Sequence, residues 1–418
     1  MPGADHPFCD AERFATLERR IHDAYGRIPF YRERWDAAGV APGDVRGYAD
    51  LPKLPAITKP EIITDQETSP PFGNQLAVPK EDLHRIFCNA GSLYLWFTAG
   101  DMDAIGAMFA AQFETMGVRS TDVVDVSSTF HWLMAGTNMD PALRRLGAAV
   151  IPGGPGMSEL RMKLMREVGV TVLEAFTPYA EELASRFEAY GIDAESDLAV
   201  RLLMIGGELR QREARQRLER AWGGAVVREF YGASEAGMVS AECFEVGDGM
   251  HLSPYAVIEV IDPDTGEHVE PGEPGEVVTS ELYRTAQRFI RYRTGDITEG
   301  VILEPCACGR TTPRLGRIVG RTGDVARVKG LFVAPAVLEQ LVRARTDGAR
   351  WHVTVHRPGT IDSMLLRVEH PGGDGAELRG ALVKDVKGAI GLTCEVETVP
   401  PGTLPEDGPR IDDRRDFS

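Results

Sequence analysis

The sequence predicts an α/β protein: a large N-terminal domain with βαβ sheets and a small β subdomain, followed by a small C-terminal α+β domain. From about residue 84 to 240, short apolar runs alternate with helical patterns, which is typical of βαβ units around a buried, mostly parallel sheet. After residue 250, strands alternate with Gly/Pro turns, which indicates the β subdomain. Near residue 321 a third pattern begins that is long enough for a separate compact domain.

Each predicted element has a local signal. Apolar residues recur at helical spacing from residue 10 to 38, and Pro29 ends a helix within that segment. A Pro-rich loop then leads to a helix start at 58–61. The predicted strands of the large domain are 122–126, 148–152, 170–174 and 202–205, linked by amphipathic segments such as 158–167 and 179–190. The β subdomain has strands at 258–261 and 275–279, and the last domain has strands at 351–355, 364–368 and 395–399 with a helix at 376–388.

Composition excludes several classes of protein. The 418 residues include 46 Lys+Arg against 63 Asp+Glu, a formal net charge of −17, whereas a nucleic-acid-binding domain needs a basic face. No run reaches the ~18 apolar residues of a membrane span, and the N-terminus lacks a signal-peptide pattern. We therefore expect a cytoplasmic protein that binds neither nucleic acid nor membrane. In that compartment its six cysteines would be free, reactive or metal-bound.

Five collinear motifs carry most of the information about function. They are Tyr-Gly-Arg-Ile-Pro-Phe-Tyr at 25–31, Ile-Gly-Gly-Glu at 205–208, Arg-Glu-Phe-Tyr-Gly-Ala-Ser-Glu at 228–235, Tyr-Arg-Thr-Gly-Asp at 292–296 and Gly-Arg-Thr-Gly-Asp-Val-Ala-Arg-Val-Lys-Gly at 320–330. In this order and spacing they closely resemble the phenylacetate-CoA ligase family, which belongs to the adenylate-forming superfamily of acyl-CoA synthetases, adenylation domains and luciferases. The resemblance covers nearly the whole chain.

The resemblance implies a nucleotide site for ATP or AMP with Mg²⁺. Glu235 would hold the Mg²⁺, a hard cation suited to carboxylate oxygen, and Ser234 would contact the α-phosphate. Asp296 would accept both ribose hydroxyls, because a carboxylate offers two acceptor oxygens. The residues assigned to the nucleotide are Gly206, Gly207, Glu208, Tyr231, Gly232, Ser234, Asp296 and Arg317.

A hinge is implied at Asp324, the position at which this superfamily rotates its small C-terminal domain between two half-reactions. A few loop-end residues can absorb such a rotation. We therefore expect an acyl- and nucleotide-binding domain at 1–322 and a mobile lid domain at 323–418. The catalytic candidates are Glu235, Arg327, Lys329 and His131.

An acyl pocket is also implied by position in the family. Its expected lining is Phe130, Trp132, Met134 and Tyr179. His131 would contact the carboxylate or thioester, although a packed core histidine explains this residue equally well. The expected thiol is CoA or the phosphopantetheine of an acyl carrier protein.

A metal site is a separate prediction. Cys243, His251, Cys306 and Cys308 offer three thiolates and one imidazole, a complete tetrahedral set for Zn²⁺. The segment Cys308-Gly-Arg310 resembles a Cys-Gly-Arg-Thr segment found in a subset of the family, in which similar positions bind structural zinc. The alternative is four unrelated residues. With every position filled by protein, the ion would be structural.

The chain departs from the family pattern at two places. The phosphate loop, at 85–98, is shortened and has no lysine, and the segment 404–413 lacks the C-terminal lysine that stabilises charge as the adenylate forms. Arg410 is the nearest cation there, and its planar fork is not equivalent to an ammonium. Losing one preorganised donor costs roughly 10²–10³ in rate, so ATP-driven adenylation would be weakened unless other residues substitute.

Three hypotheses follow. The first is a ligase that activates a carboxylic acid, such as an aryl acid, through an acyl-AMP and passes it to a thiol. The second is an ATP-independent acyltransferase that moves an acyl group from a thioester to a carrier protein or amine, and the third is a non-catalytic binding protein on the same scaffold. The last two are motivated by the missing phosphate loop and lysines.

Overall fold

The computed structural model describes residues 8–89, 93–206, 212–322, 326–329, 331–333, 335–359, 361–371, 375–405 and 409–415. The chain divides into two compact units, one formed by Met1–Thr177 and Phe187–Thr322 and the other by Pro178–Arg186 and Gly323–Ser418. The sequence did not indicate that 178–186 groups with the second unit. The hinge candidate Asp324 and the nucleotide candidates Gly207 and Glu208 lie outside the described residues.

A nine-stranded mixed sheet forms the centre of the first unit, in the order β13-β14-β9-β8-β7-β6-β5-β3-β4. Its parallel strands are β3 (Val123–Val126), β4 (Ala149–Ile151), β5 (Val172–Ala175), β6 (Leu202–Gly206) and β7 (Val226–Ala233). Its antiparallel strands are β8 (Gly237–Ala241), β9 (Met250–Leu252), β13 (Val301–Ile302) and β14 (Arg314–Leu315). The four core strands predicted from apolar runs are confirmed, and the antiparallel edge is an addition.

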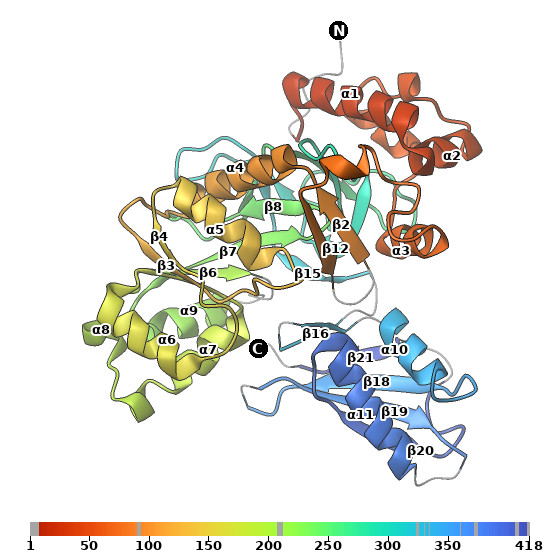
Figure 1. Ribbon diagram of the computed structural model, residues 1–418. Coiled ribbons are helices and arrows are strands. Elements are labelled where there is room, and N and C mark those ends of the chain that lie inside the picture. The colour runs from red at the N-terminus through yellow and green to blue at the C-terminus, as the bar shows by residue number, and fades with distance from the viewer. Residues whose placement is uncertain are drawn as a thin grey trace. The chain divides into compact units, whose positions relative to one another are not determined.

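Helices cover both faces of this sheet. In Figure 1, α4 (Ala99–Thr115) and α5 (Ala135–Arg145) lie on one side of the parallel strands, and α6 (Ser158–Leu164) and α9 (Arg212–Ala221) lie on the other. Helix α8 (Ala194–Asp197) also belongs to the first unit, whereas α7 (Thr177–Ser185) lies almost entirely in the segment 178–186 that groups with the second unit. Every residue of β5 and β6 is buried, as expected of strands covered on both faces, and Glu174 is their one charged residue.

The N-terminal helices follow from their caps. Asp10 caps α1 (Ala11–Arg27), and Pro29 both ends the first predicted helix and begins α2 (Pro29–Ala37), since proline is suited to the first helical position. At α3 (Lys59–Thr68), Thr58 and Glu61 form a capping box. Short turns of other helix types lie at Pro42–Asp44, Tyr48–Lys53, Lys80–Asp82, Met165–Gly169 and Glu188–Tyr190.

Two further sheets belong to the first unit. The β subdomain is an antiparallel sheet of β10 (Ala256–Ile261), β11 (Gly275–Glu281), β12 (Tyr292–Thr298) and β15 (Ile318–Arg321). The other is a hairpin of β1 (Arg85–Asn89) and β2 (Leu93–Phe97). Residues 93–97 therefore form a strand within the segment where the family has its phosphate loop.

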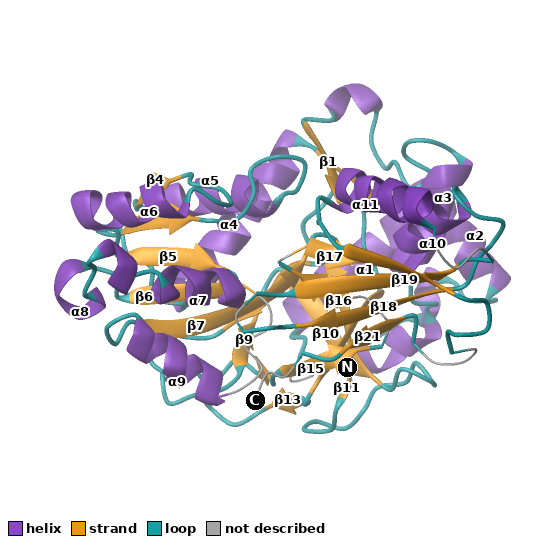
Figure 2. Ribbon diagram, turned by 90° about the horizontal axis from the view of Figure 1, so that it is seen from below, coloured by secondary structure: helices purple, strands orange, loops and turns teal. Residues whose placement is uncertain are grey.

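The second unit has its own hydrophobic core. Strands β18 (Trp351–His356), β19 (Ser363–Glu369), β20 (Glu395–Val399) and β21 (Ile411–Asp413) form one sheet, and β16 (Ala326–Val328) and β17 (Leu331–Val333) form a hairpin. Figure 2 shows β18, β19 and β21 side by side. The helices are α10 (Pro335–Arg343) and α11 (Ala376–Ile390). Among the described residues, no helix is both long and apolar enough to cross a membrane.

Candidate functional site

Tyr231 and Asp296 connect the large sheet to the β subdomain. The Tyr231 hydroxyl, from β7, donates a hydrogen bond to Asp296 Oδ2 in β12 at 2.8 Å. Arg321 of β15 pairs with the other side of this carboxylate, with Nε 2.9 Å from Oδ1. Burial first, and then the Asp296 charge, raise the pKa of Tyr231 well above its usual value, so the phenol remains a proton donor. Two residues that the sequence assigned to one nucleotide site are thus in contact.

The turn from β7 to β8 needs glycine. A Cβ on Gly232 would lie 2.5 Å from the carbonyl oxygen of Gly237, and Gly237 has a φ of +70°, a conformation that glycine adopts freely. At the end of the neighbouring strand β6, a Cβ on Gly206 would lie 2.9 Å from the Phe230 ring. A side chain at either Gly232 or Gly206 would therefore force neighbouring atoms to shift, so glycine is needed both in the strand that leads to Ser234 and Glu235 and in its neighbour β6.

Glu235 is paired with Lys59, a residue that the sequence motifs did not single out. Lys59 Nζ lies 2.9 Å from Glu235 Oε1, and the Glu235 side chain is only 3% exposed. Burial is the largest influence and acts to raise the pKa of Glu235, but the charge and hydrogen bond of Lys59, the Glu235 backbone N–H and the charge of Arg284 together outweigh it, so the net pKa is lowered. The carboxylate is therefore ionised at neutral pH. In the sequence, the feature that could have drawn attention to Lys59 is that lysine is rare, with only seven in the chain.

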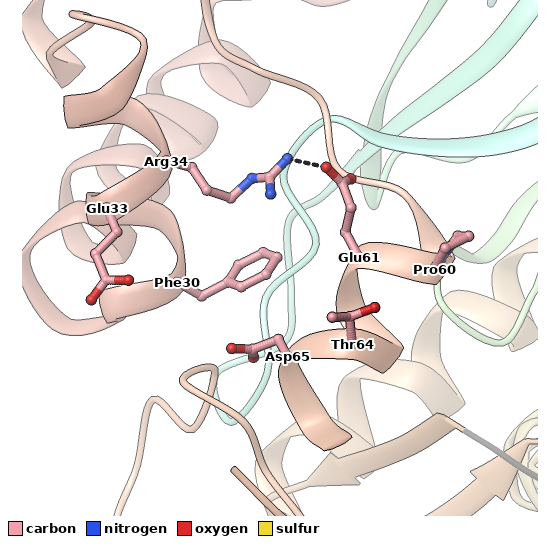
Figure 3. A pocket seen from close by; sticks show the side chains of 7 residues that line it. All are labelled: Phe30, Glu33, Arg34, Pro60, Glu61, Thr64 and Asp65. Carbon is pink, nitrogen blue, oxygen red and sulfur yellow. Dashed lines mark hydrogen bonds and ion pairs between the residues drawn. The ribbon is translucent and has the colours of Figure 1, made fainter. Parts of the chain in front are cut away.

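The start of α3, which carries Lys59, is anchored by Glu61. Glu61 Oε2 accepts hydrogen bonds from the Thr58 backbone N–H and hydroxyl, both at 2.7 Å, and its Oε1 lies 2.6 Å from Arg34 Nη2. Figure 3 shows Arg34 reaching from α2 toward Glu61 on α3. Because both carboxylate oxygens are engaged, the turn that holds Lys59 is fixed on two sides.

The same ion pair borders a surface pocket of about 400 Å³. Its lining, shown in Figure 3, is Phe30, Glu33, Arg34, Pro60, Glu61, Thr64 and Asp65. None of the residues that the sequence assigned to a site is among them. We therefore describe this pocket as a feature of the α2–α3 region and assign it no ligand.

Arg284 supplies a second positive charge, after that of Lys59, next to the turn that carries Ser234. Arg284 is fully buried, and its Nη2 donates a 2.7 Å hydrogen bond to the Ser234 carbonyl. Its guanidinium lies 4.8 Å from the ring centres of both Phe97 and Phe289. The neighbouring Thr285 N–H and hydroxyl both donate to Asp101 Oδ1 at 2.7 Å. The first turn of α4 is thereby tied to the residues beside the Ser234 turn.

The β1–β2 hairpin occupies the place of the expected phosphate loop. Its residues 90–92 lie outside the described part of the chain. Trp96 of β2 is buried, and its indole N–H donates to the Ala286 carbonyl at 2.8 Å. Strand β2 is therefore packed against the segment 284–286, and its Phe97 ring lies beside the Arg284 guanidinium.

The acyl-pocket candidates at 130–134 follow Ser128, which is hydrogen-bonded to the buried carboxylate of Glu174. Glu174, at the end of β5, accepts hydrogen bonds from the Ser128 hydroxyl at 2.7 Å and the Ser128 N–H at 3.0 Å. Burial raises the pKa of Glu174 to about 7 against these hydrogen bonds. Of the residues that follow, Phe130 is half-buried, Met134 is buried, and His131 and Trp132 are exposed, Trp132 to 77%. The alternative of a packed core histidine at His131 is therefore wrong.

The remaining candidates are distributed over both units. Arg317 forms an exposed ion pair with Glu299 in the first unit. Tyr179 belongs to the segment grouped with the second unit. In the β16–β17 hairpin, Arg327 lies opposite Phe332 in the strand register, and Lys329 is an exposed residue at the tip.

The four predicted metal ligands meet at the antiparallel edge of the large sheet. Cys243 follows β8, His251 lies in β9, and Cys306 and Cys308 lie in the loop between β13 and β14. All four ligand atoms lie within 4.8 Å of one another. The Cys243 and Cys306 sulfurs are 3.8 Å apart, and Cys308 Sγ is 3.6 Å from His251 Nε2.

These distances fit a tetrahedral Zn²⁺ site. With Zn–S near 2.3 Å and Zn–N near 2.0–2.1 Å, ligand pairs in a tetrahedron are separated by about 3.8 Å for two sulfurs and about 3.6 Å for sulfur and nitrogen. His251 Nδ1 lies 2.8 Å from the Thr312 hydroxyl, which orients the ring. Burial first, and then Arg310 and Arg314, lower the pKa of His251 to about 4. The imidazole is therefore neutral at neutral pH, as a metal ligand must be.

Comparisons with known proteins agree with this architecture. Residues 102–283 match the family model described as AMP-binding enzyme. The chain is 30% identical to the phenylacetate-coenzyme A ligase of Thermus thermophilus, with 93% of this chain and 92% of that protein covered, and 30% identical to that of Pseudomonas putida, with 94% and 92% covered.

A solved structure of 2-hydroxyisobutyryl-CoA ligase, in complex with 2-HIB-AMP and CoA, has a TM-score of 0.89 and 25% identity to this chain, and the match covers 99% of this chain and 94% of the other. This likeness confirms the predicted α/β class. The full-length sequence relationship goes further. The chain belongs to the phenylacetate-coenzyme A ligase family.

Proposed function

We propose that the protein is an AMP-forming ligase that activates a carboxylic acid as an acyl-adenylate and transfers the acyl group to a thiol. The observation that carries this proposal is the pair of contacts flanking one turn, Tyr231 with Asp296 and Glu235 with Lys59. A nucleotide needs an acceptor for its ribose hydroxyls at one end and charge compensation for its phosphates at the other. Residues 231–235 and their partners supply groups of both kinds, which supports the proposal.

In the first half-reaction, a carboxylate oxygen of the acid attacks the α-phosphorus of ATP. The bond from that phosphorus to the bridging oxygen breaks, and pyrophosphate leaves. Glu235 would hold Mg²⁺, which neutralises phosphate charge. Lys59 supplies an ammonium at the same turn, and Arg284 adds positive charge behind the Ser234 carbonyl. In this proposal the two cations would compensate in part for the lysines absent from the phosphate loop and the C-terminal segment.

In the second half-reaction, the thiol sulfur attacks the acyl carbon of the adenylate. The bond from that carbon to the AMP oxygen breaks, AMP leaves, and the thiol proton passes to solvent. Lys329 is exposed at the tip of the β16–β17 hairpin. It is the residue of the second, smaller unit that we propose takes part in this step. CoA and a carrier-protein phosphopantetheine are the two thiols to test.

The acid is proposed to be aryl or otherwise apolar. Phe130 and Met134 provide apolar side chains after the Ser128 loop, and His131 is exposed beside them. Apolar side chains at the acyl position would favour such a substrate.

Zinc would have a structural role. Three thiolates and one imidazole complete the tetrahedron and leave no open position for substrate. By joining the β8–β9 edge to the 306–308 loop, the ion would stabilise the side of the sheet next to the Ser234 turn.

One observation favours a second candidate, the ATP-independent acyltransferase. The chain has no lysine between residues 81 and 98 or between 388 and 418, so the family's usual cations for pyrophosphate departure are missing. Incubation with ATP and a panel of acids, without thiol, separates the two candidates. Pyrophosphate release with formation of acyl-AMP supports the ligase, whereas acyl transfer from a supplied acyl-CoA that is unchanged by omitting ATP supports the acyltransferase.

A further inference from the structure

The tip of the β16–β17 hairpin has an unusual backbone. Val328 pairs with Leu331, so Lys329 is the first residue of the connecting turn. Its φ is +51°, in the left-handed region that residues with a side chain seldom adopt. Such a conformation persists only where the surroundings hold it.

Asp362 is the residue that holds it. The carboxylate Oδ2 accepts a hydrogen bond from the Lys329 backbone N–H at 3.2 Å. Arg357 Nε donates to Oδ1 at 2.7 Å, and Arg415 Nη1 donates to Oδ2 at 2.9 Å. Asp362 is 2% exposed, so this acid is buried with two guanidinium partners and one backbone amide.

The network extends to the central strands of the small unit. Arg357 follows β18 and Asp362 precedes β19, while Asp413 is the last residue of β21. Arg415 donates from Nε to Asp413 Oδ1 at 2.8 Å and from Nη2 to Asp413 Oδ2 at 2.6 Å. The Lys329 amide is thus connected to three neighbouring strands through directional, charge-assisted bonds.

A contribution to stability does not by itself explain why these ion pairs are buried. Burying ion pairs carries a desolvation penalty that well-packed apolar residues would avoid. What the pairs provide is geometry, because a carboxylate held from both sides fixes the amide that it accepts. The side chain that projects from this fixed backbone is exposed, and it is that of Lys329.

We infer that Asp362, held by Arg357 and Arg415, is a positioning residue that presents Lys329 for the thiol-capturing half-reaction. The inference rests on the proposed function for the part played by Lys329. The geometry of the network belongs entirely to the small unit and can be tested separately.

The experiment is a double-mutant cycle. Lys329→Ala, Asp362→Asn and the double variant are assayed for acyl transfer from a supplied acyl-adenylate to CoA, and for pyrophosphate release without CoA. Both single variants should lower acyl transfer about tenfold or more and leave pyrophosphate release within about twofold, and the double variant should be no slower than Lys329→Ala, because residues that act as a unit are non-additive. Lys329→Arg should retain most of the transfer.

Asp385→Asn is the matched control, since Asp385 lies in the same unit and its partner is Arg345 rather than a residue of the hairpin network. It should leave both half-reactions unchanged. If the losses of Asp362→Asn and Lys329→Ala multiply, or if Asp362→Asn slows both half-reactions equally, the positioning role is overturned. Should Asp362→Asn fail to fold, Arg357→Gln replaces it, because the Asp362–Arg415 pair is then kept.

Hydrogen exchange gives a readout that does not depend on activity. In the wild-type protein the amides of 326–333 should be protected, and Asp362→Asn should accelerate exchange there while leaving α10 unchanged. If the wild type shows no acyl transfer, the proposed function fails but this result still tests the network. Unchanged exchange at 326–333 would contradict it.

Discussion

Lys59 Nζ lies 2.9 Å from Glu235 Oε1, which joins the start of α3 to the turn between β7 and β8. This contact places an ammonium beside the carboxylate expected to hold Mg²⁺. It is the main structural reason to regard adenylation as feasible in a chain that lacks the family's usual phosphate-binding lysines.

Lys59→Ala should slow acyl-adenylate formation by about 10²-fold, the cost of one preorganised donor to developing charge. Lys59→Arg should recover part of the rate, because it retains the charge. Pyrophosphate release during single turnover is the measurement. Lys53→Ala is the control, since Lys53 forms a comparable but exposed pair with Asp50. Equal rates for Lys59→Ala and Lys53→Ala would exclude a role for the Lys59–Glu235 pair.

Tyr231→Phe should weaken ATP binding modestly. The variant removes the 2.8 Å hydrogen bond to Asp296, worth about 0.5–1.5 kcal/mol, or roughly two- to tenfold in the KM for ATP. Tyr25→Phe removes a similar Tyr–Asp bond, to Asp36, far along the chain from this motif, and should leave that KM unchanged. The prediction fails if both variants behave alike in steady-state assays.

The purified protein should contain about one zinc per chain. Cys306→Ser should lose the metal and lower the melting temperature; for a unit of this size a loss of about 3 kcal/mol corresponds to roughly 3–5 °C. Elemental analysis and thermal unfolding of the same samples measure both effects. Cys88→Ser, at a half-buried cysteine outside the cluster, should retain metal and stability. Full stability without bound metal would contradict a structural site.

Glu174 should make unfolding pH-dependent. Its folded pKa of about 7 lies above the ordinary 4.5 because of burial. Between these values the folded state binds the extra proton, so the free energy of unfolding should fall by about 3 kcal/mol as pH rises from about 4.5 to about 7 and then level off. Urea unfolding at several pH values measures this slope.

Glu174→Gln should flatten that profile, because glutamine does not titrate. The surface substitution Glu167→Gln, at a side chain that is 60% exposed, should keep the wild-type slope. If Glu174→Gln keeps the same slope, another group is responsible.

The sequence was most informative where local chemistry decides structure. The runs that became β3 to β6 are mostly apolar, and β5 and β6 are buried along their whole length even though β5 contains Glu174. Three cysteines with one histidine are a recognisable ligand set wherever they meet. Lys59 could not be predicted in the same way. Its partner is distant in the chain, and only the packing of α3 beside the β7–β8 turn brings them together.

The exposure of side chains was also beyond the sequence. Trp132 and Met134 are two residues apart and both suited to an apolar pocket, yet the first is 77% exposed and the second 5%. Which of the two is buried is decided by tertiary packing, which the local sequence does not show. Likewise, nothing in the motif around Lys329 indicates that its amide is bound by Asp362.

The most direct test of the account is mass spectrometry of the products formed from ATP and a library of carboxylic acids, with and without CoA. An AMP-forming ligase predicts acyl-AMP and pyrophosphate when CoA is omitted, and acyl-CoA with AMP when it is present, both strictly dependent on ATP. Acyl transfer from supplied acyl-CoA that proceeds equally without ATP, with no acid giving an adenylate, would contradict it.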